Sequence, residues 1–263
     1  MFHVKHSSNN EERRMNERSQ IIKQKLEAAG LTLNEKQSAQ LLSYYTELVR
    51  QNKHMNLTAI TEFEEVLDKH FADSLAPLAM KEFNTWFKQG GRTILDMGTG
   101  AGFPGLPLAI ALPEARVTLA DSLKKRTSFL YDTVQMLELD NVQVVNGRAE
   151  DLAKETTYRE SFDLVVSRAV ADLPVLCEYC LPFVSVGGLF IAWKGPGIQE
   201  EVQKAEDATT LLGGAGPEIY DYTLPGSGIR HSLAVIRKAA GTPGKYPRRA
   251  GIPTKRPLGS LKK

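Results

Sequence analysis

A glycine-rich turn at residues 96–105 constrains this chain more than any other feature of its sequence. The segment reads Asp-Met-Gly-Thr-Gly-Ala-Gly-Phe-Pro-Gly, so an acidic residue is followed by four glycines. The apolar residues from Thr93 predict the end of a buried parallel strand, and residues 106–112 predict a helix. Because glycine lacks a side chain, the backbone of such a strand-to-helix turn can approach a ligand closely. We therefore expect a ligand-binding loop here.

Two classes of ligand use a turn of this kind. Residues 100–105 match the GxGxxG pattern of dinucleotide-binding folds, but this short pattern alone has low specificity. The carboxylate of Asp96, beside a helix N-terminus, would repel a pyrophosphate and attract the positively charged amino acid moiety of S-adenosylmethionine. We therefore expect S-adenosylmethionine as the cofactor, bound by a loop that includes Asp96, Gly98 and Gly100. NAD is the alternative ligand.

The composition is that of a globular protein. The chain has 263 residues, of which 42% are hydrophobic, enough for a substantial core. It contains no apolar run of membrane-spanning length, and its first 14 residues are too polar for a signal peptide, so a cytoplasmic location is expected. The only two cysteines, Cys177 and Cys180, form a single CxxC without a companion pair, so no metal site is predicted.

The formal net charge of +2 hides a strong asymmetry. Residues 237–263 carry nine Lys and Arg residues and no acidic residue, so the rest of the chain is net negative. Contact with a polyanion is therefore expected in this basic tail. A solvated, disordered end is the alternative interpretation of the same residues.

The pattern along the chain predicts four regions. They are a disordered leader (1–18), a helical extension (19–88), a main domain (89–240) and a basic C-terminal tail (241–263). Ser19 can cap a helix over residues 21–29, and Asn34 can cap a second helix that runs to about Lys53.

The main domain alternates short apolar runs with helical segments. Five such runs cover residues 93–97, 116–120, 142–145, 162–167 and 189–193, and two more cover residues 218–224 and 231–237. The last two, joined at residues 225–228, predict an antiparallel pair. The sequence thus predicts an α/β fold: a doubly wound, Rossmann-like sheet of seven strands whose last pair is antiparallel, as in class I methyltransferases.

Charged residues follow three of the predicted strands. Asp121 could accept hydrogen bonds from ribose hydroxyls or cap the next helix. Glu150 or Asp151 could accept from the amine of an adenine, although acidic residues are also common in a first helical turn. Arg168 leaves a buried strand and needs a partner, which could be a ligand or a structural carboxylate.

Six motifs in a fixed order resemble one known family. They are residues 55–60 (Met-Asn-Leu-Thr-Ala-Ile), 69–75 (Lys-His-Phe-Ala-Asp-Ser-Leu), 96–105, 121–126 (Asp-Ser-Leu-Lys-Lys-Arg), 167–170 (Ser-Arg-Ala-Val) and 245–255 (Lys-Tyr-Pro-Arg-Arg-Ala-Gly-Ile-Pro-Thr-Lys). The chain is similar over about residues 20–258 to the glucose-inhibited division protein B family, the bacterial 16S ribosomal RNA guanine-N(7) methyltransferases.

The resemblance implies a set of residues that contact the methyl donor. These are Gly98, Phe103, Ala149, Glu150 and Arg168. It also implies the substrate, a guanine in a single-stranded loop of 16S ribosomal RNA, alone or in the small ribosomal subunit. The chain departs from the family pattern at Thr99, where a smaller residue is usual, and at Asp121, where glutamate is common.

The predicted reaction requires no catalytic acid or base, because N7 of guanine carries a lone pair and no proton. Arg168 and Lys194 are candidates to hold the guanine or a neighbouring phosphate; Lys194 could instead be a solvated surface charge. In the tail, Arg248, Arg249 and Lys255 are expected to reach phosphates, and Tyr246 is expected to stack on a base.

Four polar residues of the helical extension are candidates for the edge of the site, although each could simply cap or brace a helix. They are Asn56, His70, Asp73 and Ser74. A monomer without a membrane partner is expected. Rival hypotheses are a methyltransferase for another RNA or a small molecule, and an RNA-binding assembly factor that keeps the fold without activity.

Overall fold

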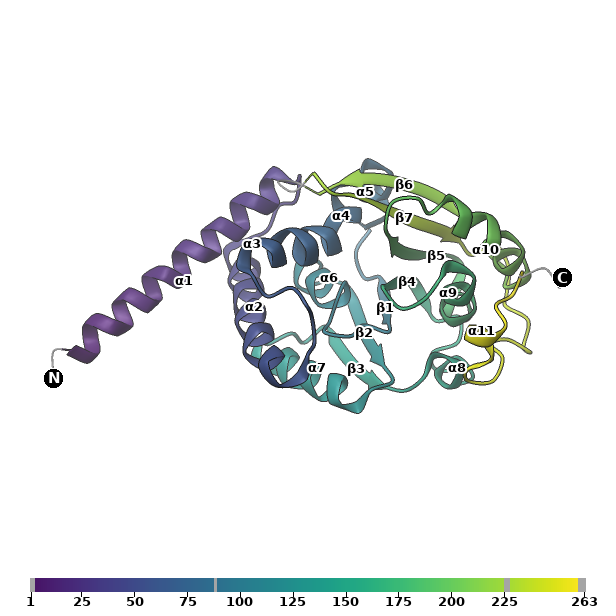
Figure 1. Cartoon of the computed structure of the whole chain (residues 1–263), viewed down its shortest axis with the longest axis horizontal. Coiled ribbons are helices and arrows are strands. Elements are labelled where there is room, and N and C mark those ends of the chain that lie inside the picture. The colour runs from purple at the N-terminus through teal and green to yellow at the C-terminus, as the bar shows by residue number, and fades with distance from the viewer. Residues whose placement is uncertain (1–2, 88, 225–227, 260–263) are drawn as a thin grey trace.

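A seven-stranded sheet with the order β3-β2-β1-β4-β5-β7-β6 forms the centre of the computed structural model, which describes residues 3–87, 89–224 and 228–259 (Figure 1). The strands are β1 (Thr93–Met97), β2 (Arg116–Asp121), β3 (Val142–Asn146), β4 (Phe162–Arg168), β5 (Val184–Lys194), β6 (Glu218–Thr223) and β7 (Arg230–Arg237). Strands β1 to β5 are parallel, and β7 runs antiparallel to both β5 and β6. The predicted sheet is confirmed; residues 225–227 of the predicted turn lie outside the described part.

Helices cover both faces of the sheet. They are α1 (His3–Ala28), α2 (Glu35–Met55), α3 (Phe63–Val66), the π-helical η1 (Leu67–Ala72), α4 (Asp73–Ala79), α5 (Lys81–Phe87), α6 (Gly105–Ala111), α7 (Lys124–Met136), α8 (Ala149–Leu152), α9 (Leu173–Cys180), the 3₁₀ turn η2 (Leu181–Phe183), α10 (Gln199–Leu211) and α11 (Ile252–Lys255). The side chains of the adjacent residues Ile94 and Leu95 belong to two different hydrophobic clusters, as expected when successive strand residues face opposite sides.

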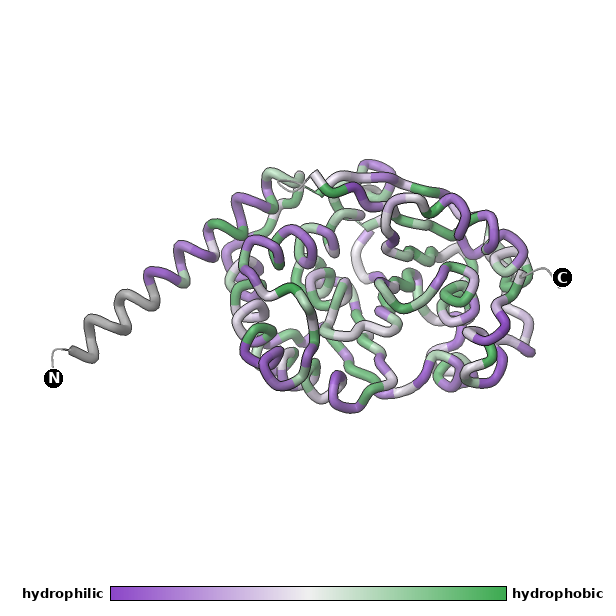
Figure 2. The backbone as a smooth tube through the Cα atoms, viewed as in Figure 1, coloured by the Kyte–Doolittle hydropathy of each residue, from purple (hydrophilic) through white to green (hydrophobic). Residues whose placement is uncertain are grey.

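The two hydrophobic clusters lie on opposite faces of the sheet. The larger contains buried residues of α1, α2, η1, α4, α6 and α7, so the N-terminal helices and the sheet share one core. The second contains residues of α8, α9 and α10. Figure 2 shows hydrophobic segments concentrated along the central strands, whereas α10 and the middle turns of α1 are largely hydrophilic.

The start of the first helix differs from the prediction. Helix α1 begins at His3 rather than near Ser19, and its N-terminal half projects away from the sheet (Figure 1). The first glycine or proline of the chain is Gly30, so nothing in residues 3–28 interrupts a helix, and Arg13 and Glu17 form an ion pair one turn apart. The polarity of the residues before Ser19 led to the prediction of a disordered leader, but polarity does not prevent a helix. None of the described helices is long and apolar enough to cross a membrane.

The order of the strands fixes where a ligand can bind. Strand order reverses between β1 and β4, so the chain leaves these neighbouring strands toward opposite sides of the sheet. The loops after β1 and β4 therefore flank a crevice at the carboxyl edge of the sheet. Gly98 and Val170, one on each loop, lie against each other there.

Candidate functional site

Three adjoining cavities lie at the carboxyl ends of the parallel strands. The central cavity, of about 460 Å³, lies between the glycine loop, His70 and Arg168. The tail-side cavity, of about 230 Å³, continues from Gly98 and Asp121 toward Ala149 and Glu150. The outer cavity, of about 490 Å³, opens beyond His70 and Arg168 toward the ends of β5 and β7. His70, Arg168 and Ala169 line both the central and the outer cavities.

The glycine loop is held against the neighbouring strand β2 by its own backbone. The N–H of Gly98 donates to the carbonyl of Ala120 at 2.8 Å, and the N–H of Gly100 donates to the carboxylate of Asp121 at 3.0 Å. Gly98 has a φ of +74°, and an added Cβ would lie only 2.6 Å from a methyl of Val170. This position therefore requires glycine both for its conformation and for space.

Asp96 lies behind the glycine loop and does not line the central cavity. Its side chain is fully buried, and Oδ2 accepts hydrogen bonds from the Thr99 hydroxyl at 2.6 Å and the Gly105 N–H at 2.7 Å. Among the described residues, Oδ1 has no hydrogen-bond partner. Burial raises the pKa of Asp96 to about 6, although the two hydrogen bonds oppose the shift. The sequence led us to expect that Asp96 faces the ligand. Its carboxylate instead binds the hydroxyl of Thr99 and the N–H of Gly105 within the loop itself.

Asp121 fixes the turn before α7 but does not cap the helix, whose N-cap is Leu123, and its contact with a ribose stays a prediction. Its Oδ1 accepts from the Leu123 N–H at 2.8 Å, which fixes the turn into α7, and its Oδ2 accepts from Gly100 and Arg126. The side chain is almost fully buried but lines the central and tail-side cavities. Asp121 therefore fixes two loops and still presents an acidic wall to a ligand.

Phe103 brings the N-terminal helices into the site. The ring of His70 stacks on Phe103 with centroids 4.3 Å apart, and the guanidinium of Arg168 lies over Phe103 at 5.0 Å. Burial, reinforced by the charge of Arg168, lowers the pKa of His70 to about 4, so this imidazole is neutral at pH 7. The predicted residues Phe103, His70 and Arg168 are thus brought together.

Arg168 finds the carboxylate partner that its buried position required. Its Nη1 donates to Asp73 Oδ2 at 2.8 Å and to the Lys69 carbonyl at 3.1 Å. Asp73 Oδ1 also accepts from Tyr222 at 2.5 Å and from His231 Nδ1 at 2.8 Å. Burial alone would raise the pKa of Asp73, but these hydrogen bonds and the charge of Arg168 bring it below its usual range. Arg168 therefore makes a structural ion pair and also lines two cavities.

The remaining predicted positions divide into two groups. Ala149 and Glu150 line the tail-side cavity, and Lys194 lines the outer cavity, where it pairs with Glu201 at 2.6 Å. Asn56, which ends α2, and the fully buried Ser74 line none of the three cavities. Both had been candidates for the edge of the site as polar residues of the helical extension.

The tail is docked against the main domain and is not a solvated, disordered end. Tyr246 is only 8% exposed and packs in the second hydrophobic cluster, so it is not placed to stack on a base. Arg248 is bound to the buried carboxylate of Glu178 and is not free for a phosphate. Arg249 and Lys255 are exposed, as an RNA contact requires. Residues 260–263, including Lys262 and Lys263, lie outside the described part.

Two residues of the site carried little signal in the sequence. Tyr222 and His231 stand opposite each other on β6 and β7, which brings both to Asp73. The predicted antiparallel pair placed their strands, but not their register, so this contact was not foreseen. The hydroxyl of Thr58 lies 2.9 Å from His70 Nε2. Thr58 belongs to the motif at residues 55–60, but the sequence predicted no role for it.

Neither cysteine lines any of the three cavities. Cys177 and Cys180 are free and buried, and burial raises the pKa of the Cys177 thiol to about 12. Within the described ranges, no group of three or more His, Cys, Asp or Glu side chains is arranged to hold a metal ion.

Comparisons with known proteins identify the family. The family model GidB, described as rRNA small subunit methyltransferase G, matches residues 37–222, well over half of the chain. The chain belongs to the GidB family. A GidB relative from Alkaliphilus metalliredigens, named "Ribosomal RNA small subunit methyltransferase G", is 49% identical over 242 residues, which are 92% of this chain and 99% of the relative. The namesake from Pelotomaculum thermopropionicum is 46% identical over 91% of this chain and 98% of its own length.

A solved structure supports the fold assigned to this GidB chain. An O-methyltransferase from Bacillus cereus in complex with SAH aligns with 74% of this chain and 91% of its own, with a TM-score of 0.52 and 19% identity. At that identity the likeness concerns the fold alone. The predicted family, the predicted enzyme class and the Rossmann-like methyltransferase fold are confirmed.

Proposed function

We propose that this GidB-family chain transfers the methyl group of S-adenosylmethionine to N7 of a guanine in 16S ribosomal RNA. One observation carries the proposal: the central cavity, beside the glycine loop, adjoins the outer cavity, since His70, Arg168 and Ala169 line both. A methyl donor in the first and a base in the second would meet at this junction. Both cavities fall in the range of roughly 300–1,000 Å³ that small-molecule sites occupy.

The residues around the central and tail-side cavities fit the methyl donor. The space at Gly98, which a Cβ would fill, lets the backbone approach the amino acid part. The carboxylate of Asp121 can accept from ribose hydroxyls, and Ala149 and Glu150 line the space for an adenine. The donor, when bound, supplies an electrophilic methyl group on a positively charged sulfur.

The neighbouring side chains match a transfer that needs no proton acceptor. The lone pair of guanine N7 forms the new bond to carbon while the carbon–sulfur bond breaks, and no proton is removed from the guanine. The neutral His70 and the loop-bound Asp96 are therefore not required as bases. Asp73 offsets the charge of Arg168, which would otherwise repel the sulfonium. What the protein contributes is alignment and exclusion of water.

The substrate RNA is held by the exposed cations Arg249 and Lys255, with Lys194 at the outer cavity nearest the base. Such phosphate contacts supply affinity that falls as salt rises. We infer a monomer acting in the cytoplasm, where small ribosomal subunits are made. The free, buried cysteines are compatible with a reducing compartment.

The decisive experiment supplies labelled S-adenosylmethionine with three acceptors: small ribosomal subunits, naked 16S RNA and transfer RNA. We expect label in 16S RNA, as naked RNA or in subunits, with the methyl group mapped to guanine N7 by mass spectrometry. Label only in transfer RNA would show that transfer RNA, not 16S RNA, is the substrate. Methylation at another guanine atom would refute the mechanism that needs no base. Absence of label with all three, although the donor raises the melting temperature, would favour a non-catalytic assembly factor.

A further inference from the structure

The C-terminal tail forms a wall of the tail-side cavity. Gly251 and Thr254 line this cavity together with Ala149 and Glu150. The N–H of Gly251 donates to Glu150 Oε1 at 3.0 Å, and the Thr254 hydroxyl lies 2.9 Å from that of Tyr179 on α9. The carboxylate expected at the adenine is therefore fixed by a residue about a hundred positions away in the chain.

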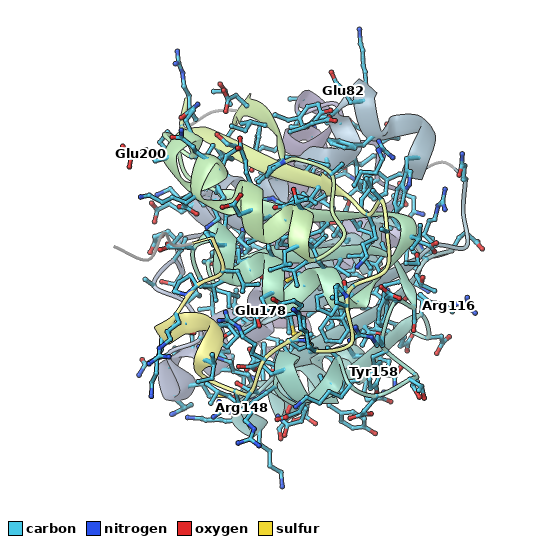
Figure 3. The ribbon with its side chains drawn as sticks, turned by 90° about the vertical axis from the view of Figure 1, so that its right-hand side faces the viewer. Glu82, Arg116, Arg148, Tyr158, Glu178 and Glu200 are labelled. Carbon is cyan, nitrogen blue, oxygen red and sulfur yellow. The ribbon has the colours of Figure 1, made fainter. Side chains whose placement is uncertain are left out.

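Buried contacts anchor this wall. The Arg248 guanidinium donates to both carboxylate oxygens of Glu178, with Nη2 2.5 Å from Oε2, and the Arg248 backbone N–H donates to Oε1 at 2.8 Å. Glu178 is fully buried, and Arg248 supplies its counter-charge. Arg159 adds hydrogen bonds to the carbonyls of Thr242 and Tyr246. Figure 3 looks onto this side, where the yellow C-terminal segment runs past Glu178.

The same segment presents its other cations to solvent. Arg249, Lys255 and Arg256 are exposed, whereas Tyr246 and Pro253 are buried. Residues 246–256 thus have an inner side, in contact with Glu178, Glu150 and the cavity, and an outer basic side suited to phosphates. If two ligands bind on opposite sides of one short segment, each holds the segment in place and thereby raises the affinity for the other.

We propose that residues 246–256 are part of the methyl-donor site and close it over the adenine, so that RNA bound to their outer cations raises the affinity for the donor. The inference rests on the proposed function, because the donor must occupy the central and tail-side cavities. It assigns Arg248 a positioning role and Arg249 an RNA-binding role. By linkage, the donor raises RNA affinity by the same factor.

Hydrogen exchange with the full chain tests the wall directly, with S-adenosylhomocysteine as the probe. We expect slower exchange of backbone amides both in residues 98–103 and in residues 248–255 when the probe is bound. Protection of the glycine loop without the tail would overturn the inference and leave the proposed function standing. Protection of neither segment would refute the donor site itself.

Two neighbouring arginines provide matched variants. R248M removes the anchor and should weaken binding of S-adenosylhomocysteine at least tenfold, whereas R249M should change it less than twofold and instead weaken binding of a 16S RNA fragment. Because R248M leaves Glu178 unpaired, T254W is the second variant: Thr254 is exposed but lines the cavity, so its enlargement should block the probe in a folded chain. Unchanged affinity in a folded R248M and in T254W would overturn the inference.

The coupling is measured by titrating S-adenosylhomocysteine with and without saturating 16S RNA fragment. We expect at least a fivefold lower Kd with RNA in the parent chain, and less than a twofold change in R248M. Equal Kd values with and without RNA in the parent chain would show that the segment does not couple the two ligands.

Discussion

At the scale of single residues, two buried ionisable groups beside the glycine loop make the stability of the fold depend on pH in opposite directions. Burial raises the pKa of Asp96 to about 6 and lowers that of His70 to about 4. Both shifts disfavour the charged form. Their stability effects therefore oppose each other over the same range, from about pH 4 to about pH 6.

The variants D96N and H70Q should change the pH dependence of unfolding in opposite directions. Between about pH 4 and 6, folded Asp96 keeps a proton that the unfolded chain has lost, so its contribution to stability falls as pH rises. Between about pH 6.5 and 4, the unfolded chain protonates His70 while the folded chain does not, so the contribution of His70 falls as pH falls. Each full effect is of order 3 kcal/mol.

Urea unfolding at several pH values checks this prediction. Relative to the parent chain, D96N should make the free energy of unfolding rise more steeply from about pH 4 to 6, and H70Q should make it rise less steeply or fall. If the free energy of unfolding of both variants changed with pH as it does in the parent chain, neither group would titrate as proposed.

Gly98 offers a second residue-scale prediction. An alanine there would adopt a left-handed conformation at a cost of roughly 1–2 kcal/mol, and its Cβ would push Val170, which lines both the central and the tail-side cavities. We expect G98A to weaken S-adenosylhomocysteine binding at least tenfold by calorimetry. The control is G216A, where an added Cβ meets nothing within 4 Å. A G98A protein with the affinity of G216A would remove the loop from the site.

At the scale of elements, the sequence predicts those features whose causes are local. Asn34 caps α2 as expected, because its side chain accepts from the N–H of Gln37 only three residues away. The strands are found by their apolar runs for the same reason. The docking of the tail could not be predicted, because Arg248 finds Glu178 across 70 residues. A basic tail looks the same in sequence whether it is free or docked.

Helix α1 allows a test of where its packed part begins. Ile22 is fully buried in the core shared with the sheet, whereas its neighbour Ile21 is 40% exposed. I22A should therefore lower the free energy of unfolding by about 2–5 kcal/mol, and I21A should cost about 0.5 kcal/mol or less, as is usual at the surface. Denaturant unfolding of both variants measures the difference. Equal losses would mean that α1 does not pack as described.

At the scale of the whole molecule, the N-terminal helices and the methyltransferase sheet build the site together. Asp73, the first residue of α4, holds Arg168 from β4 and Tyr222 and His231 from β6 and β7. The indole N–H of Trp193 on β5 donates to the Asp73 carbonyl at 2.8 Å. One carboxylate thus joins elements up to 158 residues apart. The motifs pointed to Asp73 and Arg168 separately, but not to their pairing, which depends on the assembled fold.

Removing this carboxylate should therefore destabilise the whole molecule. D73N leaves the buried guanidinium of Arg168 facing a neutral amide, and breaking such a pair costs about 3–5 kcal/mol. D221N is the matched control on β6. Asp221 is exposed, and within the described residues its side chain accepts a hydrogen bond only from the Ser232 hydroxyl. We therefore expect D221N to lower the free energy of unfolding by about 0.5 kcal/mol or less. Urea unfolding at pH 7 compares the two. If D73N cost no more than D221N, Asp73 would not be the link between the helices and the sheet, and Arg168 would have to be held by other contacts.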